Sequence, residues 1–313
     1  MPTLVTGAAG FVGGHLIDLL AAGGADIVAW HRPGGTPPAG SRWPSVRWQG
    51  IDLLDAESVY RAVASIRPSA VYHCAGAAHV GLSWGDTART LAINVRGTHH
   101  LLEGLRRTQS SARLVIPGSA MVYKAADRAL TEDDPLVPRS PYALSKLAQE
   151  MEGLRAIGDG LHVTVARAFN HMGPRQDPFF AASGFARRIA DIEAGRWEPE
   201  IAVGNLDARR DLTDVRDTVR AYEAILERGQ TGRPYNVCSG TAITIGNLLD
   251  RLLARARVPI RVRVDPARMR PNDVPLLLGN PSRIRTELGW QPEIPLDRTL
   301  DDLLDDWRTR AGA

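Results

Sequence analysis

The first half of the chain alternates short apolar runs with longer amphipathic stretches. The runs that predict buried parallel strands are Leu4–Thr6, Ile27–Trp30, Ala70–His73, Leu114–Pro117 and His162–Ala166. Between them, Phe11–Ala22 and Arg89–Arg106 have the periodicity of helices with one buried face, and Thr98 falls on that face in the second. Strands and helices in this order predict an α/β fold with a doubly wound parallel sheet, a Rossmann fold.

The second half has a different pattern. Three irregular segments rich in proline and arginine interrupt it, namely Met172–Phe180, Ala194–Arg210 and Val264–Pro281. Such long segments predict a smaller, loop-built lobe that holds the substrate. We therefore expect residues 1–168 to form a dinucleotide-binding domain, to which 212–237 return, and residues 169–211 and 238–313 to form the substrate lobe.

Composition excludes several classes of partner. The 313 residues carry a formal net charge of only +3, a basic excess too small to indicate nucleic-acid binding. No apolar run approaches the roughly 20 residues of a membrane span, and a strand at the very start leaves no room for a secretory signal. Cys74 and Cys238 form neither a disulfide framework nor a metal-binding spacing. These features predict a cytoplasmic protein with no metal.

A glycine-rich turn lies between the first strand and the first helix. Its residues are Gly7, Gly10, Phe11, Val12 and Gly13, spaced as G-x-x-G-x-x-G. Glycines let the backbone approach a pyrophosphate, and the helix N-terminus supplies free N–H groups and a positive dipole. The turn therefore predicts a dinucleotide site, the alternative being a tight turn without a ligand.

The end of the second strand bears on the choice of cofactor. NAD enzymes place a carboxylate there, on the ribose 2′-hydroxyl. This chain has Arg32 and no acidic residue in the run Val28–Pro33. An arginine can pair with a 2′-phosphate, so we expect NADP(H) rather than NAD(H); otherwise Arg32 is a solvated loop residue.

Tyr142 and Lys146 are four residues apart, one turn along the same face of a predicted helix. A nearby ammonium lowers the pKa of a phenol and so helps it exchange protons near neutral pH. Lys146 and Lys124 are the only lysines in the chain, which otherwise uses arginine. A lysine kept here predicts a chemical role that arginine cannot fill.

Ser119 follows the strand Leu114–Pro117, at the sheet edge where open α/β folds bind ligands. Its hydroxyl can orient a substrate carbonyl while Tyr142 transfers a proton. The alternative is a turn serine. No G-x-S-x-G elbow surrounds it, which argues against a serine hydrolase. Ser119, Tyr142 and Lys146 are thus the predicted catalytic residues.

Together, the G-x-x-G-x-x-G turn and the Ser…Tyr-x-x-x-Lys arrangement resemble the extended short-chain dehydrogenases, in their NAD(P)-dependent epimerase/dehydratase group. The resemblance narrows to the GDP-mannose branch, to its 4,6-dehydratases and more closely to its GDP-6-deoxy-4-keto-D-mannose reductases. The runs that carry it are Phe169–Arg175, Val203–Asp211, Tyr235–Gly240, Arg270–Val274 and Glu287–Pro292.

The resemblance implies further cofactor contacts. Asp52, with Leu53 beside it, stands where the family contacts the adenine amine. Asn94 matches the helix asparagine near the cofactor, although it may equally be read as a buried polar residue satisfied by backbone. Ala75 and Gly76, which follow the third strand, are assigned to the cofactor as well.

The resemblance also implies a nucleotide-sugar site. Asn170, Arg210 and Arg270 would contact the diphosphate, and Asp273 replaces the family's glutamate on a ribose hydroxyl with a shorter side chain. Asn205 belongs to the same predicted site. His79, His171 and Trp84 are expected to line the sugar.

Met121 stands where the dehydratases of this branch carry a glutamate and where the epimerase–reductases carry a cysteine. Methionine has no proton to exchange. A base for the sugar's C-5 is therefore missing, whereas hydride transfer to a C-4 ketone needs none. Met121 can also be a packing residue, and that agrees with a reductase too.

These features predict NADPH-dependent reduction of the C-4 ketone of a GDP-4-keto-6-deoxyhexose, by a homodimer that binds neither nucleic acid nor membrane. One alternative is a redox-neutral nucleotide-sugar 4,6-dehydratase or 4-epimerase that keeps its cofactor bound, which turnover without added NADPH would reveal. Another is a non-catalytic NADP-binding sensor, which would not need the catalytic trio.

Overall fold

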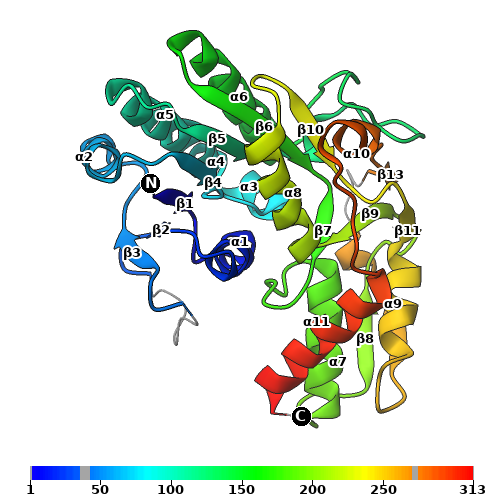
Figure 1. Cartoon of the computed structure of the whole chain (residues 1–313). Helices are drawn as coiled ribbons and strands as arrows, with labels where there is room; N and C mark the ends of the chain where they lie inside the picture. The colour runs from blue at the N-terminus through cyan, green and yellow to red at the C-terminus, as the bar shows by residue number, and fades with distance from the viewer. Residues whose placement is uncertain (1, 36–42, 270–273, 313) are drawn as a thin grey trace.

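A computed structural model describes residues 2–35, 43–269 and 274–312 (Figure 1). Its centre is a seven-stranded sheet in the order β10-β6-β5-β4-β1-β2-β3, with every neighbouring pair parallel. The strands are β1 (Thr3–Thr6), β2 (Ile27–His31), β3 (Arg47–Gly50), β4 (Ala70–His73), β5 (Arg113–Pro117), β6 (His162–Ala168) and β10 (Pro234–Val237). The prediction of a doubly wound parallel sheet is confirmed, and β3 and β10 extend it at its two edges.

Two layers of helices cover the sheet, because successive strand residues face opposite sides. Val5 packs into one core with α1 (Phe11–Ala22) and α8 (Val215–Arg228), while Leu4 packs into the other. The second core is built on α2 (Ala56–Ile66) and α5 (Gly97–Arg107). On that side the sheet edge also carries α6 (Pro141–Arg155), followed by the short turn η3 (Ala156–Asp159).

The predicted helix Arg89–Arg106 is not continuous. It consists of α4 (Thr87–Leu91), a π-helical turn η1 (Ala92–Arg96) and α5, with α3 (Val80–Gly85) just before it. Asn94 lies fully buried in the π turn. Single π turns occur mostly at functional sites, and this one aims Asn94 at the edge of the sheet.

The second lobe has its own strands and core. Its elements are β7 (Asn170–Met172), α7 (Ala181–Glu193), β8 (Glu200–Val203), β9 (Arg209–Asp214), β11 (Ala242–Thr244), α9 (Ile245–Leu253), β12 (Arg261–Val264), η4 (Pro266–Arg268), β13 (Leu276–Leu277) and α11 (Leu296–Ala311). Helix α10 (Ser282–Leu288) instead packs against β10 and α8, and its Ile284 and Leu288 belong to the same core as Val5. Strand β9 pairs with β7, β11 and β13, and β8 pairs with β12. Apolar faces of α7, α9 and α11 pack together at the lower right of Figure 1. Within the described residues no helix is long and apolar enough to cross a membrane.

A buried ion pair ties α6 to β6. The Arg167 guanidinium binds the Glu150 carboxylate through Nη2–Oε1, 2.5 Å, and Nε–Oε2, 3.1 Å. Arg167 also donates to the Tyr123 hydroxyl at 3.0 Å and to the Glu132 carbonyl at 2.9 Å. Tyr123 follows the short turn η2 (Ala120–Val122), which begins after Ser119. The ion pair therefore supports the segment that carries Ser119.

We expect Glu150→Leu to destabilise the fold by about 3–5 kcal/mol, because it strands the buried Arg167 without its partner. Denaturant unfolding followed by circular dichroism measures this loss. Glu152→Leu, at a more exposed position on the same helix, is the matched control and should change stability by less than about 0.5 kcal/mol. Equal unfolding midpoints for the two variants would contradict the assigned role of the ion pair.

Candidate active site

The glycine turn brings the ends of β1 and β4 into close contact. Gly7 has φ +64°, a conformation that favours glycine, and a Cβ there would lie 2.6 Å from the Ala75 Cα. A Cβ on Gly13 would lie 2.3 Å from the Gly7 carbonyl oxygen. Gly10 precedes α1 and supplies no side-chain cap, so the first N–H groups of the helix stay open to an anion. This cradle fits a dinucleotide pyrophosphate.

The predicted contacts for the adenosine end lie after β2 and β3. Arg32 is exposed, and its guanidinium makes no hydrogen bond or ion pair with any described residue. The Asp52 carboxylate accepts a hydrogen bond from the Leu54 N–H at 2.9 Å, while Leu53 packs against Gly97 at the start of α5. Arg32 is thus available to a 2′-phosphate, and Asp52 is oriented by its own turn.

The Asn94 side chain hydrogen-bonds to the turn after β4. Its Oδ1 accepts from the Ala77 N–H at 2.7 Å, and its amide donates to the Ala77 carbonyl and to Ser145 Oγ at 3.2 and 2.8 Å. A Cβ on Gly76 would lie 3.0 Å from the same Oδ1. The structure therefore places Asn94 as a buried support for the turn that holds Ala75 and Gly76.

Tyr142 and Ser119 are positioned by the first turns of two neighbouring elements. Ser140 caps α6 through its Oγ, which accepts from the Ala143 N–H at 3.1 Å, and Pro141 follows as the first helical residue. The Tyr142 N–H donates to Ser83 Oγ at 3.1 Å. The Ser119 hydroxyl lies close enough to the half-buried Tyr142 to lower the pKa of its phenol. The two predicted catalytic hydroxyls are therefore brought together.

Burial raises the pKa of Tyr142, and the nearby Ser119 hydroxyl only partly opposes this. Lys146 is not among the groups that shift the phenol pKa, contrary to the expected lowering. The ammonium donates to the Pro117 carbonyl and to Gln149 Oε1. Burial also lowers the pKa of Lys146 to about 8. Tyr142 is thus a phenol that keeps its proton at neutral pH.

The predicted diphosphate contacts are spread over the second lobe. Asn170 is exposed on β7, and Arg210 lies on β9 with Nη1 donating to the carbonyls of Arg209 and Val274 at 2.9 and 2.7 Å. Asn205 Oδ1 accepts from the Asp207 N–H at 3.0 Å. Arg270 and Asp273 lie outside the described residues.

The predicted sugar-lining residues divide into two groups. His79 lies against Phe180, with ring centroids 5.0 Å apart, and its buried Nδ1 has no hydrogen-bond partner among the described residues. His171 stacks on Phe11 at 6.0 Å. Trp84, by contrast, is 58% exposed on α3. The unsatisfied nitrogen makes His79 the member of this set best suited to meet a ligand hydroxyl.

Met121 is a partly buried packing residue. It lies in the turn after Ser119 and contacts an apolar cluster that includes Val122, Tyr123 and Phe169. The Met121 side chain itself has no proton to exchange, so it supplies no acid or base there.

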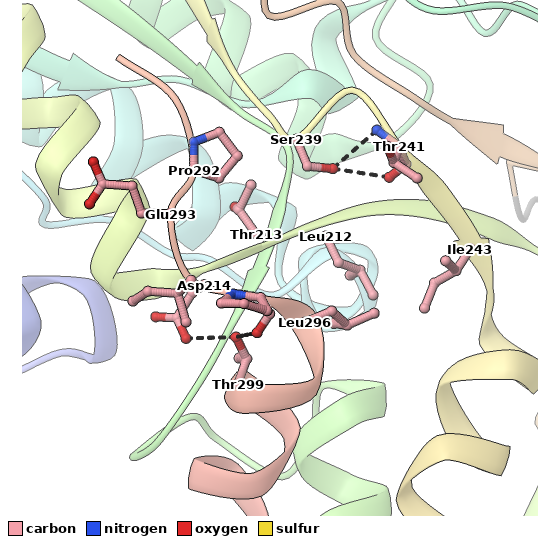
Figure 2. Close-up of a pocket in the computed structure, with 12 residues that line it drawn as sticks. Leu212, Thr213, Asp214, Ser239, Thr241, Ile243, Pro292, Glu293, Leu296 and Thr299 are labelled. Carbon is pink, nitrogen blue, oxygen red and sulfur yellow. Dashed lines mark hydrogen bonds between the residues drawn. The ribbon is translucent and has the colours of Figure 1, made fainter.

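A cavity of about 370 Å³ lies elsewhere, in the second lobe (Figure 2). It is bounded by the end of β9, the turn Ser239–Thr241 and the segment Pro292–Leu296. Ser239 Oγ bonds to the backbone of Thr241, and Asp214 accepts from Thr299 Oγ1 at 2.8 Å. None of Ser119, Tyr142 and Lys146 lines it, so it is not where their chemistry takes place.

Sequence reasoning missed the residues behind Lys146. Gln149, Thr98 and His73 form a buried hydrogen-bonded group with it, and Ser83 anchors the start of α6. One signal was available, since Gln149 lies three residues after Lys146 on the same helix face. Nothing local to their own segments singles out Thr98 or His73.

Comparison with known proteins agrees with this geometry. The family model for GDP-mannose 4,6 dehydratase matches residues 4–303. The chain is 38% identical to the GDP-6-deoxy-D-mannose reductase of Pseudomonas aeruginosa, covering 98% of this chain and 97% of that relative. It is 30% identical to the GDP-mannose 4,6-dehydratase of Yersinia enterocolitica, over 81% and 76% of the two chains. Its structure matches that of RMD from Pseudomonas aeruginosa complexed with NADPH, with TM-score 0.86, 35% identity and 99% coverage of both.

We expect Gly13→Ala to weaken dinucleotide affinity roughly 10- to 100-fold, because its Cβ would overpack against the Gly7 carbonyl at a cost of about 1–3 kcal/mol. Titration of NADPH fluorescence measures this. Gly14→Ala is the matched control, since its Cβ would make only ordinary contacts, with the Arg175 guanidinium at 3.5 Å and the Ala8 carbonyl oxygen at 3.9 Å. If both variants bind NADPH like the parent, the turn is not the pyrophosphate cradle.

Proposed function

The chain belongs to the GDP-mannose 4,6-dehydratase family, and from that premise we propose that it reduces the C-4 ketone of a GDP-4-keto-6-deoxyhexose with NADPH. With GDP-6-deoxy-4-keto-D-mannose the product would be GDP-D-rhamnose or its C-4 epimer. The observation that carries the proposal is the Ser119 hydroxyl close to the Tyr142 phenol, on the helix that also carries Lys146, with Met121 in place of a C-5 base. The similarity to a GDP-6-deoxy-D-mannose reductase supports it.

NADP(H) is the proposed cofactor, in preference to NAD(H). The structural relative binds NADPH, and the cradle at Gly7 and Gly13 fits the pyrophosphate of either dinucleotide. Arg32 adds an available guanidinium where a 2′-phosphate would lie. When bound, NADPH supplies the hydride that C-4 receives.

The protein's own side chains supply the proton that the C-4 oxygen takes up during reduction. Tyr142 donates it to the C-4 oxygen as that atom gains negative charge, and its raised pKa keeps the phenol protonated beforehand. Ser119 donates a hydrogen bond that orients the ketone. Lys146 has one ammonium N–H left for the ribose of the nicotinamide half, after its bonds to Pro117 and Gln149.

We propose that the second lobe binds the nucleotide diphosphate through Asn170, Arg210 and Arg270, since guanidinium groups bind such oxygens in a bidentate way. Asp273 and Asn205 complete this part of the site. His79 Nδ1, which lacks a partner among the described residues, is assigned to a sugar hydroxyl.

The protein is proposed to act as a homodimer in the cytoplasm. Leu82 and Trp84 on α3 and Leu144 and Met151 on α6 are all exposed, and α3 packs against α6. Large apolar side chains gathered on adjacent helices are typical of subunit interfaces. Both cysteines are free, as a reducing compartment would leave them.

The decisive assay mixes the protein with NADPH and a panel of 4-keto sugar nucleotides and follows NADPH absorbance. We expect turnover with the GDP-4-keto-6-deoxyhexose. Tyr142→Phe should lower kcat about 10²–10⁴-fold, since it removes the general acid, while NADPH affinity stays near normal. Near-normal rates in this variant would remove Tyr142 from the mechanism, and no turnover with any 4-keto sugar would refute the reductase function.

Met121 predicts the fate of the hydrogen on C-5. Reduction in deuterium oxide should leave C-5 unlabelled, because Met121 cannot act as the base that exchanges its proton, and GDP-mannose itself should not be dehydrated. Mass spectrometry of the product measures the label. Protein-dependent deuterium at C-5 would favour the redox-neutral dehydratase or epimerase instead, with His171 as the candidate base.

A further inference from the structure

We propose that Gln149 is a positioning residue for Lys146. Its side-chain carbonyl holds the ammonium in place, and a buried hydrogen-bonded chain through Thr98 and His73 holds the Gln149 amide in the required orientation. The inference deepens the proposed function, because it rests on the role given there to Lys146.

Lys146 is buried and has two acceptors within the protein. Its Nζ donates to the Pro117 carbonyl at the end of β5 and to Gln149 Oε1, one turn further along α6. An ammonium has three N–H donors. Two are therefore fixed by the protein, and the direction of the third follows from them.

Thr98 determines which way the Gln149 amide points. The Thr98 hydroxyl donates to the Asn94 carbonyl at 2.7 Å, which uses its single proton. Its oxygen must then accept from Gln149 Nε2 and from His73 Nε2, both 2.8 Å away. With its NH₂ group on Thr98, the fully buried Gln149 has only its carbonyl oxygen to offer Lys146.

His73 completes the chain. Burial and the nearby Lys146 lower the pKa of His73 to about 3, so the ring is neutral. Its proton lies on Nε2, because Thr98 Oγ1 can only accept there. Nδ1 then accepts from Thr6 Oγ1 at 2.8 Å, and Thr6 Oγ1 accepts from the Ala75 N–H at 3.2 Å. The chain thus runs from Lys146 to Ala75, the residue that contacts Gly7 in the dinucleotide cradle.

Gln149 presents only an amide oxygen to Lys146, and the pKa of His73 is about 3, so this chain holds no group basic enough to take a proton from the ammonium. The other titratable groups acting on Lys146 are Glu150 on its own helix and Cys74 after β4, and Glu150 is paired with Arg167 of β6. Tyr142 lies one turn earlier on the same helix. The buried side therefore fixes the ammonium without accepting its proton.

The composition of the chain allows a direct test. Only Lys124 and Lys146 would give signals in protein grown with ¹³Cε-labelled lysine, and Lys124 is exposed. NMR titration of the full chain would follow both, with Lys124→Arg to assign them. We expect Lys146 to titrate near 8, and the Lys124 signal serves as an internal reference.

Gln149→Glu should raise the Lys146 midpoint by about 1–3 pH units, because it places a carboxylate on the ammonium. Gln149→Leu should lower it, because it removes an acceptor from the charged form. Glu152→Gln, elsewhere on α6, is the matched control and should leave the midpoint in place. A residue that only packs the helix would not move the midpoint in opposite directions. If Gln149→Glu folds and leaves it unchanged, the proposal is wrong, whether or not Gln149→Leu folds.

The same variants separate this proposal from the proposed function. The titration needs no substrate, so its outcome is independent of turnover. If the midpoint shifts but the unsubstituted protein turns over no 4-keto sugar, the reductase function is refuted and the role of Gln149 stands. Where turnover is present, the basic limb of the kcat profile against pH should move in the direction of the Lys146 midpoint. If the protein turns over a 4-keto sugar but Gln149→Glu leaves the Lys146 midpoint unchanged, the reductase function stands and the role of Gln149 is refuted.

Discussion

A buried ammonium needs hydrogen-bond acceptors, and at Lys146 three parts of the fold meet that need. The end of β5 supplies the Pro117 carbonyl, α6 supplies Gln149, and α5 supplies Thr98 to hold Gln149. Burying a charge without such partners would cost several kcal/mol or remove the charge. The Lys146 side chain, through these hydrogen bonds, therefore fixes β5, α6 and α5 relative to one another.

The same constraint joins the chemistry to the cofactor cradle. His73 and Thr6 lie at the ends of adjacent parallel strands, and their side chains carry the hydrogen-bonded chain from Thr98 to Ala75. Ala75 in turn approaches Gly7 so closely that no side chain fits there. The carboxyl ends of parallel strands gather at one sheet edge, where such folds place their ligands. A displacement of Lys146 would thus be transmitted through these hydrogen bonds to the position of the glycine turn that is suited to the pyrophosphate.

The second lobe depends on a different buried charge. Asp211 on β9 accepts from the N–H groups of Ser239, Gly240 and Gly279 at 2.8, 2.9 and 3.3 Å, and from Ser239 Oγ at 2.6 Å. Burial raises its pKa, and these four donors counter that effect. They fix the segments on either side of β9 next to Arg210, so loops far apart in sequence are held around the residue proposed to bind the diphosphate.

The sequence by itself determined the features whose causes are local. The strand–turn–helix around Gly7, Gly10 and Gly13 and the four-residue spacing of Tyr142 and Lys146 depend only on neighbours in the chain. Tertiary structure decided the partners. Periodicity placed Thr98 on a buried face, but only the packing of α5 against α6 showed that it holds Gln149, 51 residues away. It likewise gave Lys146 the Pro117 carbonyl, 29 residues away, because a charge removed from water bonds to whatever acceptors the fold brings near.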